Sequence, residues 1–255
     1  MAQILITGGT GLIGSLLCSM LLKRGDEVVV LSTKRQVPQP LEGVRYIYWN
    51  PAEKVIDPAF STDNCIIMNL AGESVAGKRW TVDRKKAILE SRISSLQTLF
   101  ESVQKQQIGA RFLLSTSAIG YYGSGDKTFT ENDAAGSGFL AETCLQWEAA
   151  ARQFQSPELS VAIARIGIVL SRQGGALKEL IAPLQFGVAG IPGTGRQIMS
   201  WIHHEDVCRM LLFLIDRQLS GVYNAVADQP VSANTLFEAI LKIKKGLQVH
   251  IPEWM

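Results

Sequence analysis

Short apolar runs along this chain alternate with longer stretches in which apolar residues have helical spacing. The first run, Ile4 to Ile6, suits a strand that is buried on both faces. Apolar positions from Leu12 to Leu21 are helical in spacing, and Gly25 ends that stretch. A second apolar run, Glu27 to Leu31, follows at the distance that a strand–helix–strand unit requires. The pattern therefore predicts parallel strands connected by helices.

The alternation continues along the chain. Further strands are predicted at 44–49, 65–70, 111–115, 161–170 and 221–226, and further helices at 84–104, 139–151, 207–215 and 235–245. This order is typical of an α/β fold with a doubly wound parallel sheet. In such a sheet, ligands bind beyond the carboxyl ends of the strands.

Three glycines with the spacing G-x-x-G-x-x-G lie at the predicted turn between the first strand and the first helix. Such a turn points backbone N–H groups and the positive end of a helix dipole at one place, which suits a pyrophosphate. Glycines occur at this spacing in loops by chance, but here the strand, the helix and the N-terminal position agree. The turn therefore predicts a dinucleotide site that contains Gly8, Thr10, Gly11, Leu12, Ile13 and Gly14.

The end of the second strand indicates which dinucleotide is bound. An acidic residue there would accept hydrogen bonds from the ribose 2′-OH of NAD(H). This chain instead has Ser32, Thr33, Lys34 and Arg35, and two hydroxyls with two cations suit a 2′-phosphate. Lys34 and Arg35 as plain surface charges remain an alternative, so the absence of an acid is the firmer observation. We expect NADP(H) as the cofactor.

Two central strands end in residues that suit chemistry. After Cys65 to Leu70 come Ala71 and Gly72, across which the nicotinamide half of a cofactor can lie. The strand from Arg111 to Ser115 is followed by further hydroxyl-bearing residues, from Thr116 to Tyr122. The residues predicted here to contact the cofactor are Leu70, Ala71, Gly72, Ser115 and Thr116.

The candidate catalytic residues follow in the same segment. Ser117 is predicted to hydrogen-bond a substrate carbonyl or alcohol, and Tyr121 or Tyr122 to act as acid or base. Packing and turn capping are an equal alternative for the two tyrosines. Arg165 is the one charge in an apolar strand, so it must be paired or face a ligand; we include it among the cofactor contacts.

Substrate contacts are predicted at Arg79, Trp80, Arg196 and His203. Spacing alone leaves open whether Arg79, Trp80 or Arg92 reaches a substrate or lies in a surface ion pair. A flexible connector explains the glycines around Arg196 equally well, and His203 more often holds a turn than catalyses a reaction.

Composition and charge narrow the class of protein. The chain has 255 residues, 47% of them hydrophobic, and a net charge of +2 from interspersed charges, so nothing favours a nucleic-acid or membrane surface. Four scattered cysteines without a C-x-x-C pair, and only three histidines, predict buried thiols and no metal site. With no leader and no membrane span, the expected location is cytoplasmic.

Several motifs together resemble the extended short-chain dehydrogenase/reductase superfamily. They are TGGTGLIG at 7–14, NLAG at 69–72, STSAIGYYG at 115–123 and GRQIMSWIHHED at 195–206. AGESVAGKRW at 71–80, SRISSLQ at 91–97, the Trp147-Glu148 pair and RIGIVLSRQGGAL at 165–177 are similar to its atypical branch of nucleoside-diphosphate-sugar epimerases.

The resemblance implies an NAD(P)-binding Rossmann domain and a small C-terminal substrate lobe. We expect residues 1–170 with 198–225 to form the Rossmann domain, and 171–197 with 226–255 the lobe. Members typically carry a further C-terminal segment, and residues 250–255 look like the start of an element, so we expect a truncated lobe. Relatives often dimerise through the two helices here at 84–104 and 139–151, which makes a homodimer plausible.

The resemblance also implies a Ser or Thr after the fifth strand and a Tyr-x-x-x-Lys pair on the next helix. Ser117 matches the first, but the helix reads GFLAETCLQWE from Gly138. Phe139 or Leu140 falls where the tyrosine would be, and Thr143 or Cys144 where the lysine would be. A phenyl ring cannot transfer the proton that accompanies hydride transfer. Another acid is needed, with Tyr121, Tyr122 and Glu142 as candidates.

Two functions follow from these observations. One is an NADP(H)-dependent epimerase or reductase that acts on a nucleotide sugar or a related carbonyl or alcohol. The other is a catalytically silent protein in which NADP(H) occupancy sets a conformation that a partner recognises. The missing Tyr and Lys favour the second, whereas the polar residues Ser117, Tyr121, Arg165 and Arg196 favour an enzyme.

Overall fold

The computed structural model describes residues 2–76, 78–125 and 127–251. The chain divides into two compact units, the first made of Met1–Arg165 with Cys208–Asn224 and the second of Ile166–Val207 with Ala225–Met255. Relative to the expected domains, residues 166–170, 198–207 and 225 fall in the second unit.

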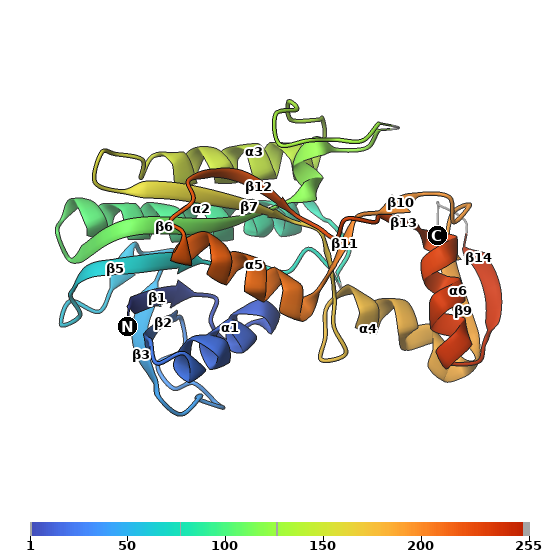
Figure 1. Ribbon diagram of the computed structural model, residues 1–255, viewed down its shortest axis with the longest axis horizontal. Helices are drawn as coiled ribbons and strands as arrows, with labels where there is room; N and C mark the ends of the chain where they lie inside the picture. The colour runs from blue at the N-terminus through green and yellow to red at the C-terminus, as the bar shows by residue number, and fades with distance from the viewer. Residues whose placement is uncertain (1, 77, 126, 252–255) are drawn as a thin grey trace. The chain divides into compact units, whose positions relative to one another are not determined.

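The first unit is built on an eight-stranded sheet in the order β12-β7-β6-β5-β1-β2-β3-β4 (Figure 1). β1 pairs in parallel with β2 and with β5, β2 pairs in parallel with β3, and β5 with β6, while β4 is antiparallel to β3. The strand order therefore reverses at β1, which is the point where doubly wound sheets bind ligands. The predicted fold class is confirmed. The strands are β1 (Gln3–Thr7), β2 (Glu27–Ser32), β3 (Val44–Asn50), β4 (Val55–Ile56), β5 (Thr62–Asn69), β6 (Ile108–Ala118), β7 (Ser160–Ile166) and β12 (Gly221–Ala225).

Helices cover both faces of this sheet because alternate strand residues are apolar on each side. Leu5, Val29 and Ile67 pack in one core with Leu96 of α2 (Val82–Gln104) and Trp147 of α3 (Phe139–Arg152). On the other side lies α1 (Leu12–Lys23), beside the part of α5 (His204–Asp216) that belongs to the first unit. The thiol of Cys208 donates to the carbonyl of Ile13 at 3.7 Å, which joins these two helices.

The predicted strand at 161–170 is two strands. β7 ends at Ile166, and β8 (Ile168–Leu170) pairs in parallel with β11 (Trp201–His203) in the second unit. The amide of Ile168 donates to the carbonyl of Ser200 at 2.9 Å. The continuous apolar pattern gave no sign of this exchange of partner strand, because both strands are apolar.

The second unit contains short strand pairs and two helices around a small core. Its core residues are Leu184, Ala189, Ile191, Ala233 and Phe237. Its other elements are α4 (Ala176–Ile181), η2 (Ala182–Phe186), β9 (Val188–Pro192), β10 (Ile198–Met199), β13 (Val231–Ser232), α6 (Ala233–Ile243) and β14 (Leu247–Ile251). The element expected to begin near His250 is β14, which begins at Leu247; residues 252–255 lie outside the described residues.

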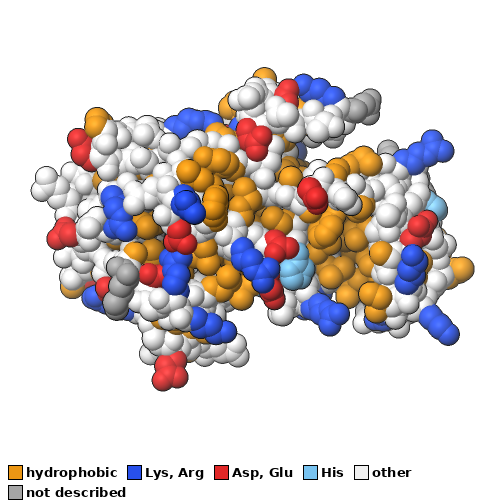
Figure 2. Space-filling model, viewed as in Figure 1, with side chains coloured by type: hydrophobic (Ala, Val, Ile, Leu, Met, Phe, Trp, Pro, Cys, Tyr) orange, Lys and Arg blue, Asp and Glu red, His pale blue; other side chains and the backbone are white. Residues whose placement is uncertain are grey.

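The distribution of charged side chains and the length and apolar character of the helices bear on the class of protein. On the face drawn in Figure 2, basic side chains lie among acidic ones rather than in one patch of a single sign. Within the described part of the chain, none of the helices combines the length and the apolar character needed to cross a bilayer.

The thiols of Cys18, Cys65, Cys144 and Cys208 are all buried. Burial raises the pKa of Cys18 and of Cys65 to about 12, and it raises the pKa of Cys144 as well. A thiol reacts as the thiolate, so these cysteines are expected to be inert in the native protein. Ellman's reagent at mildly alkaline pH should therefore label the four thiols only after denaturant is added. Rapid labelling of the native protein would contradict the burial.

Candidate functional site

The turn between β1 and α1 is closed so tightly that only glycine fits at two positions. Gly8 has a φ of 68°, and a Cβ there would lie 2.8 Å from the carbonyl carbon of Leu70. A Cβ on Gly14 would lie 2.3 Å from the carbonyl oxygen of Gly8. The amide of Gly11 donates to that same oxygen at 3.0 Å. The glycines therefore shape the turn and bring α1 against the tip of β5.

The start of α1 fits a pyrophosphate. The N-cap residue of the helix is Gly11, which has no side chain that could cap it, and the first turn of α1 contains no acidic residue. Gly11 is exposed, and a Cβ added to it would meet only the carbonyl oxygen of Gly8, at 3.2 Å. The positive end of the helix dipole lies here, and it stabilises an anion. Thr10 is exposed beside it.

At the end of β2, one predicted hydroxyl is engaged and the cations are available. Ser32 is buried, and its hydroxyl accepts from the amide of Lys34 at 3.0 Å and donates to the carbonyl of Lys34 at 3.1 Å. Thr33, Lys34 and Arg35 are exposed. The guanidinium of Arg35 lies 4.1 Å from the ring centroid of Tyr48, which holds it beside the end of the strand.

A buried polar network joins the carboxyl ends of β1, β5 and β6. The Thr7 hydroxyl donates to Oδ1 of Asn69 at 2.7 Å and accepts from the amides of Leu70 and Ala71, each at 3.2 Å. The hydroxyl of Thr116 donates to the carbonyl of Asn69 at 3.1 Å. Ser115 accepts from Nδ2 of Asn69 at 3.4 Å. The predicted cofactor residues 70, 71, 115 and 116 therefore lie together, held by Thr7 and Asn69.

Ser117 lies against a buried ion pair. Its hydroxyl donates to Oε1 of Glu148 at 2.9 Å, and Arg165 donates to the same carboxylate through Nε at 2.8 Å and Nη2 at 2.9 Å. The Glu148 side chain is 0% exposed and that of Arg165 is 2% exposed. Arg152 donates to Oε2 of Glu148 at 2.9 Å. Arg165 is therefore paired, which is one of the two roles that the sequence left open.

The two tyrosines of η1 (Ile119–Tyr122) differ in what their hydroxyls do. The Tyr122 hydroxyl accepts from Arg165 Nη1 at 2.8 Å and donates to Asn224 Oδ1 at 2.7 Å. The guanidinium of Arg165 lies 3.4 Å from the ring centroid of Tyr121. Among the described residues, the Tyr121 hydroxyl has no hydrogen-bond partner. Tyr121 thus has the hydroxyl that is available to a ligand.

The start of α3 is apolar at the positions where the family's acid would lie. Phe139 packs edge-on against Trp80 with ring centroids 5.4 Å apart, and the ammonium of Lys85 lies 5.4 Å from the Phe139 centroid. The hydroxyl of Thr143 donates to the carbonyl of Phe139 at 2.7 Å, inside the helix. Neither Phe139 nor Leu140 offers a group that transfers a proton.

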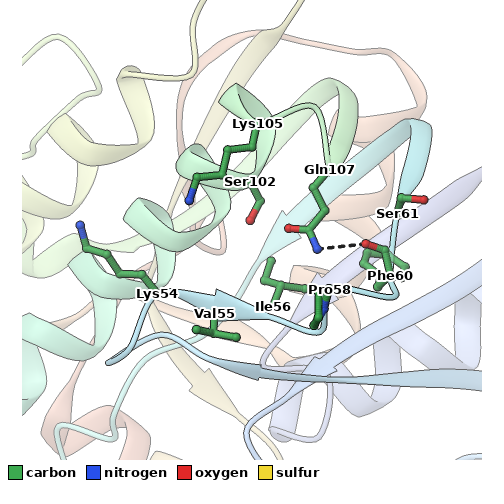
Figure 3. Close-up of a pocket in the computed structure, with 9 residues that line it drawn as sticks. All are labelled: Lys54, Val55, Ile56, Pro58, Phe60, Ser61, Ser102, Lys105 and Gln107. Carbon is green, nitrogen blue, oxygen red and sulfur yellow. Dashed lines mark hydrogen bonds between the residues drawn. The ribbon is translucent and has the colours of Figure 1, made fainter.

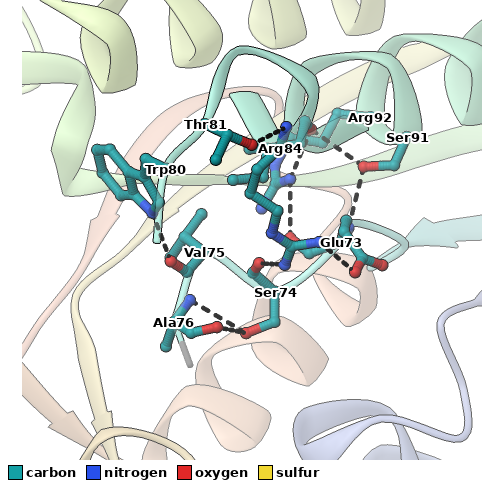
Figure 4. A network of polar contacts seen from close by, with 10 residues as sticks. Glu73, Ser74, Val75, Ala76, Trp80, Thr81, Arg84, Ser91 and Arg92 are labelled. Atoms are coloured by element: carbon teal, nitrogen blue, oxygen red, sulfur yellow. Dashed lines mark hydrogen bonds and ion pairs between the residues drawn. The ribbon is translucent and has the colours of Figure 1, made fainter. Parts of the chain in front are cut away.

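The loop after β5 is braced by arginines of α2 (Figure 4). Arg84 donates to Oε1 of Glu73 at 2.6 Å and to the carbonyl of Ser74, and the indole N–H of Trp80 donates to the carbonyl of Val75 at 2.8 Å. Of the predicted substrate residues in this unit, Trp80 is 39% exposed and Arg79 is exposed.

The other two predicted substrate residues, Arg196 and His203, lie in the second unit and are both exposed. Nδ1 of His203 accepts from the amide of Glu205 at 3.3 Å, so the histidine holds the turn that begins α5. This contact agrees with the structural alternative considered for His203.

A separate pocket of about 410 Å³ lies at the opposite end of the strands (Figure 3). Its residues lie in and next to β4, at the end of α2 and in the segments that precede β5 and β6, so the pocket is at the amino ends of these two parallel strands. It contains none of the predicted site residues. Its lining consists of Lys54, Val55, Ile56, Pro58, Phe60, Ser61, Ser102, Lys105 and Gln107.

Sequence reasoning missed three residues that organise the site: Glu148, Asn69 and Asn224. Each is a polar residue in an element whose neighbours are apolar, and that contrast is the signal that could have found Glu148 on a packed helix face. The partner of Arg165 lies 17 positions away on another element, so no local spacing predicts it.

The parallel sheet with its glycine turn defines a Rossmann protein of the short-chain dehydrogenase/reductase type. The model of the NAD dependent epimerase/dehydratase family matches residues 4–225, and the chain belongs to that family.

Individual relatives agree with this assignment. The chain is 39% identical over 233 residues to the epimerase family protein Mb2239 of Mycobacterium bovis, covering 91% of this chain and 75% of the relative. It is similar to the crystal structure of human epimerase family protein SDR39U1 with NADPH, with a TM-score of 0.83, 28% identity, and coverage of 98% and 83% of the two chains. It is also similar to a nucleoside-diphosphate sugar epimerase of Corynebacterium glutamicum, with a TM-score of 0.75, 32% identity, and coverage of 97% and 53%.

Proposed function

We propose that this protein binds NADP(H) and oxidises or reduces a carbonyl or alcohol group of a nucleotide sugar or related small molecule. The observation that carries the proposal is the tight glycine turn at the start of α1, beside a β2 end that has cations and no acid. The NADPH in the human relative and the name of the Corynebacterium relative support the cofactor and the substrate class.

The residues take the following roles in this proposal. Gly8 to Gly14 bind the pyrophosphate, Lys34 and Arg35 bind the 2′-phosphate, and Leu70 to Gly72 lie under the nicotinamide. When bound, the nicotinamide supplies or accepts a hydride. Ser115, Thr116 and Asn69 keep the strand tips in place through their mutual hydrogen bonds.

Ser117 and Tyr121 carry the proton chemistry of the proposal. Because the Ser117 hydroxyl donates to Glu148, it offers lone pairs to a substrate hydroxyl rather than a proton to a carbonyl. Tyr121 has the available hydroxyl and acts as the proton donor or acceptor. Tyr122 and Arg165 hold the Tyr121 ring, and we assign Arg165 this positioning role because its guanidinium is already paired.

NADPH is expected to bind more tightly than NADH. Replacement of Arg35 by Asp puts an acid beside the 2′-phosphate and removes a charge-assisted hydrogen bond, so the preference should fall by about tenfold or more. Calorimetric titration of both cofactors measures it. Arg45→Asp is the matched control, since Arg45 belongs to β3 and its guanidinium lies 5.6 Å from the Phe60 centroid. Equal affinity of the wild-type protein for both cofactors would contradict the assignment.

A measurement of turnover distinguishes the proposed enzyme from the alternative, which is a catalytically silent NADP(H)-binding protein. The apolar residues Phe139 and Leu140 favour the alternative. NADP⁺-loaded protein is incubated with a panel of nucleotide sugars, and nicotinamide absorbance and product mass are followed. A new product or reduced cofactor supports the enzyme; clear cofactor binding without any change across the panel would count against it. The expected homodimer and cytoplasmic location stay predictions.

A further inference from the structure

Arg92, on α2, lies beside the tip of β5. A Cβ built on Gly72 would be 3.1 Å from Cζ of Arg92 and 3.3 Å from its Nη2. The guanidinium therefore fills the space next to Gly72, and only a glycine there lets it come so close. In the proposed function, the nicotinamide and the reacting carbon of the substrate lie at this same strand tip.

The protein contacts this guanidinium through one nitrogen, whose hydrogen bond to Glu73 is visible in Figure 4, and through one face, which lies near Trp147. Nη1 donates to the carbonyl of Ile88 at 2.8 Å and to the carbonyl of Glu73 at 3.1 Å. The centre of the guanidinium is 4.9 Å from the ring centroid of Trp147. Among the described residues, Nη2 and Nε of Arg92 have no hydrogen-bond acceptor. Two of its donor positions are thus fixed in place and unused.

The positive charge of Arg92 is not part of an ion pair within the part of the chain that the structure describes. No carboxylate of the described residues forms an ion pair with it, and the nearby Glu73 carboxylate is bound to Arg84 at 2.6 Å. Burial lowers the pKa of Arg92, yet an arginine keeps its proton at neutral pH. A half-buried cation that forms no ion pair is unfavourable, and such groups are common at binding sites.

Cys144 of α3 is within electrostatic range of Arg92. Thr143 or Cys144 falls where the resemblance expects the lysine, and neither brings a charge, since burial raises the pKa of the Cys144 thiol. Arg92 thus supplies a positive charge, from a different helix, in the region where the expected lysine is missing.

We propose that Arg92 determines substrate specificity by binding a carboxylate that the substrate carries next to its reacting carbon. The inference rests on the proposed function and narrows it to acidic sugars or similar carboxylates. A planar carboxylate matches the two free donors of a guanidinium in a bidentate pair. The diphosphate of a nucleotide sugar does not suit this place, because it is attached at the far side of the sugar ring.

The test compares UDP-glucuronic acid with UDP-glucose, which differ in the carboxylate at one end of the sugar. Both are titrated calorimetrically into NADP⁺-loaded protein. The wild-type protein should bind UDP-glucuronic acid at least about tenfold more tightly, as a charge-assisted bidentate pair implies. Arg92→Gln should abolish the preference, and Arg92→Lys should keep only part of it. Lys86→Gln is the matched control, because it removes a positive charge from an exposed position of the same helix, where the side chain is 69% exposed, and should leave the preference intact.

Free glucuronate and glucose, compared by saturation-transfer NMR, make the same test without the nucleotide. Equal binding of acid and neutral sugar by the wild-type protein, or an unchanged preference in Arg92→Gln, would overturn the inference. A change confined to the unfolding midpoint of Arg92→Gln would do so as well, since it would mean that Arg92 only packs on Trp147. Failure of the proposed function gives different results: the protein would not bind NADP⁺, or the NADP⁺-loaded protein would convert none of the nucleotide sugars.

Discussion

Replacement of Glu148 by alanine should lower the free energy of unfolding by about 3–5 kcal/mol. Glu148 is 0% exposed and is the only carboxylate that pairs with the buried Arg165 among the described residues. Without it, the guanidinium would remain charged inside the core, and the Ser117 hydroxyl would lose its acceptor. The loss is large because an unpaired buried charge keeps its desolvation penalty while its attraction is gone.

Urea unfolding followed by circular dichroism measures this effect. The matched control is Lys54→Ala, which removes the ion pair with Glu101, whose two side chains are 49% and 35% exposed. Exposed pairs contribute about 0–1 kcal/mol, so this variant should unfold nearly as the wild type does. A Glu148→Ala variant that loses no more than the Lys54→Ala variant would show that the ion pair does not organise the core around Ser117.

The second large effect concerns two glycines of the same turn. Gly14→Ala should unfold the turn, because its methyl group would lie 2.3 Å from the backbone oxygen of Gly8. Gly11→Ala should fold normally, since its methyl group meets only one atom, at 3.2 Å, but it enters the space in front of α1. We expect each variant to bind NADPH about tenfold more weakly or worse, as loss of one hydrogen bond to a charged group implies.

Thermal unfolding distinguishes the two causes of weaker NADPH binding, which are loss of the folded turn in Gly14→Ala and a methyl group in front of α1 in Gly11→Ala. The melting temperature should fall for Gly14→Ala and stay close to that of the wild type for Gly11→Ala. Unchanged NADPH affinity in Gly11→Ala would mean that the pyrophosphate does not approach the start of α1.

The turn could be predicted from sequence because its signal is local. Gly8, Gly11 and Gly14 lie between a strand and a helix that each have a strong apolar pattern. A glycine turn between two such elements is enough to predict a dinucleotide site. The same holds for the hydroxyl residues at the carboxyl end of β6. Such features depend on a few consecutive residues.

The polar partners could not be predicted, because they join distant segments. Arg165 required a partner, but the choice of Glu148 depends on how α3 packs on β7. Arg92 reaches Gly72 only because α2 lies along the tip of β5. The break at Gly167 depends on β11, which comes some 30 residues later. Long-range packing, rather than any local pattern, fixes these contacts.

The central claim is that NADP(H) lies along the turn from Gly8 to Gly14 with its reactive end at Gly72. A crystal structure of the NADPH complex tests it most directly. We expect the pyrophosphate at the start of α1, the 2′-phosphate beside Lys34 and Arg35, and the nicotinamide over Leu70 to Gly72. A dinucleotide bound elsewhere, or with its 2′-phosphate away from the end of β2, would contradict the account.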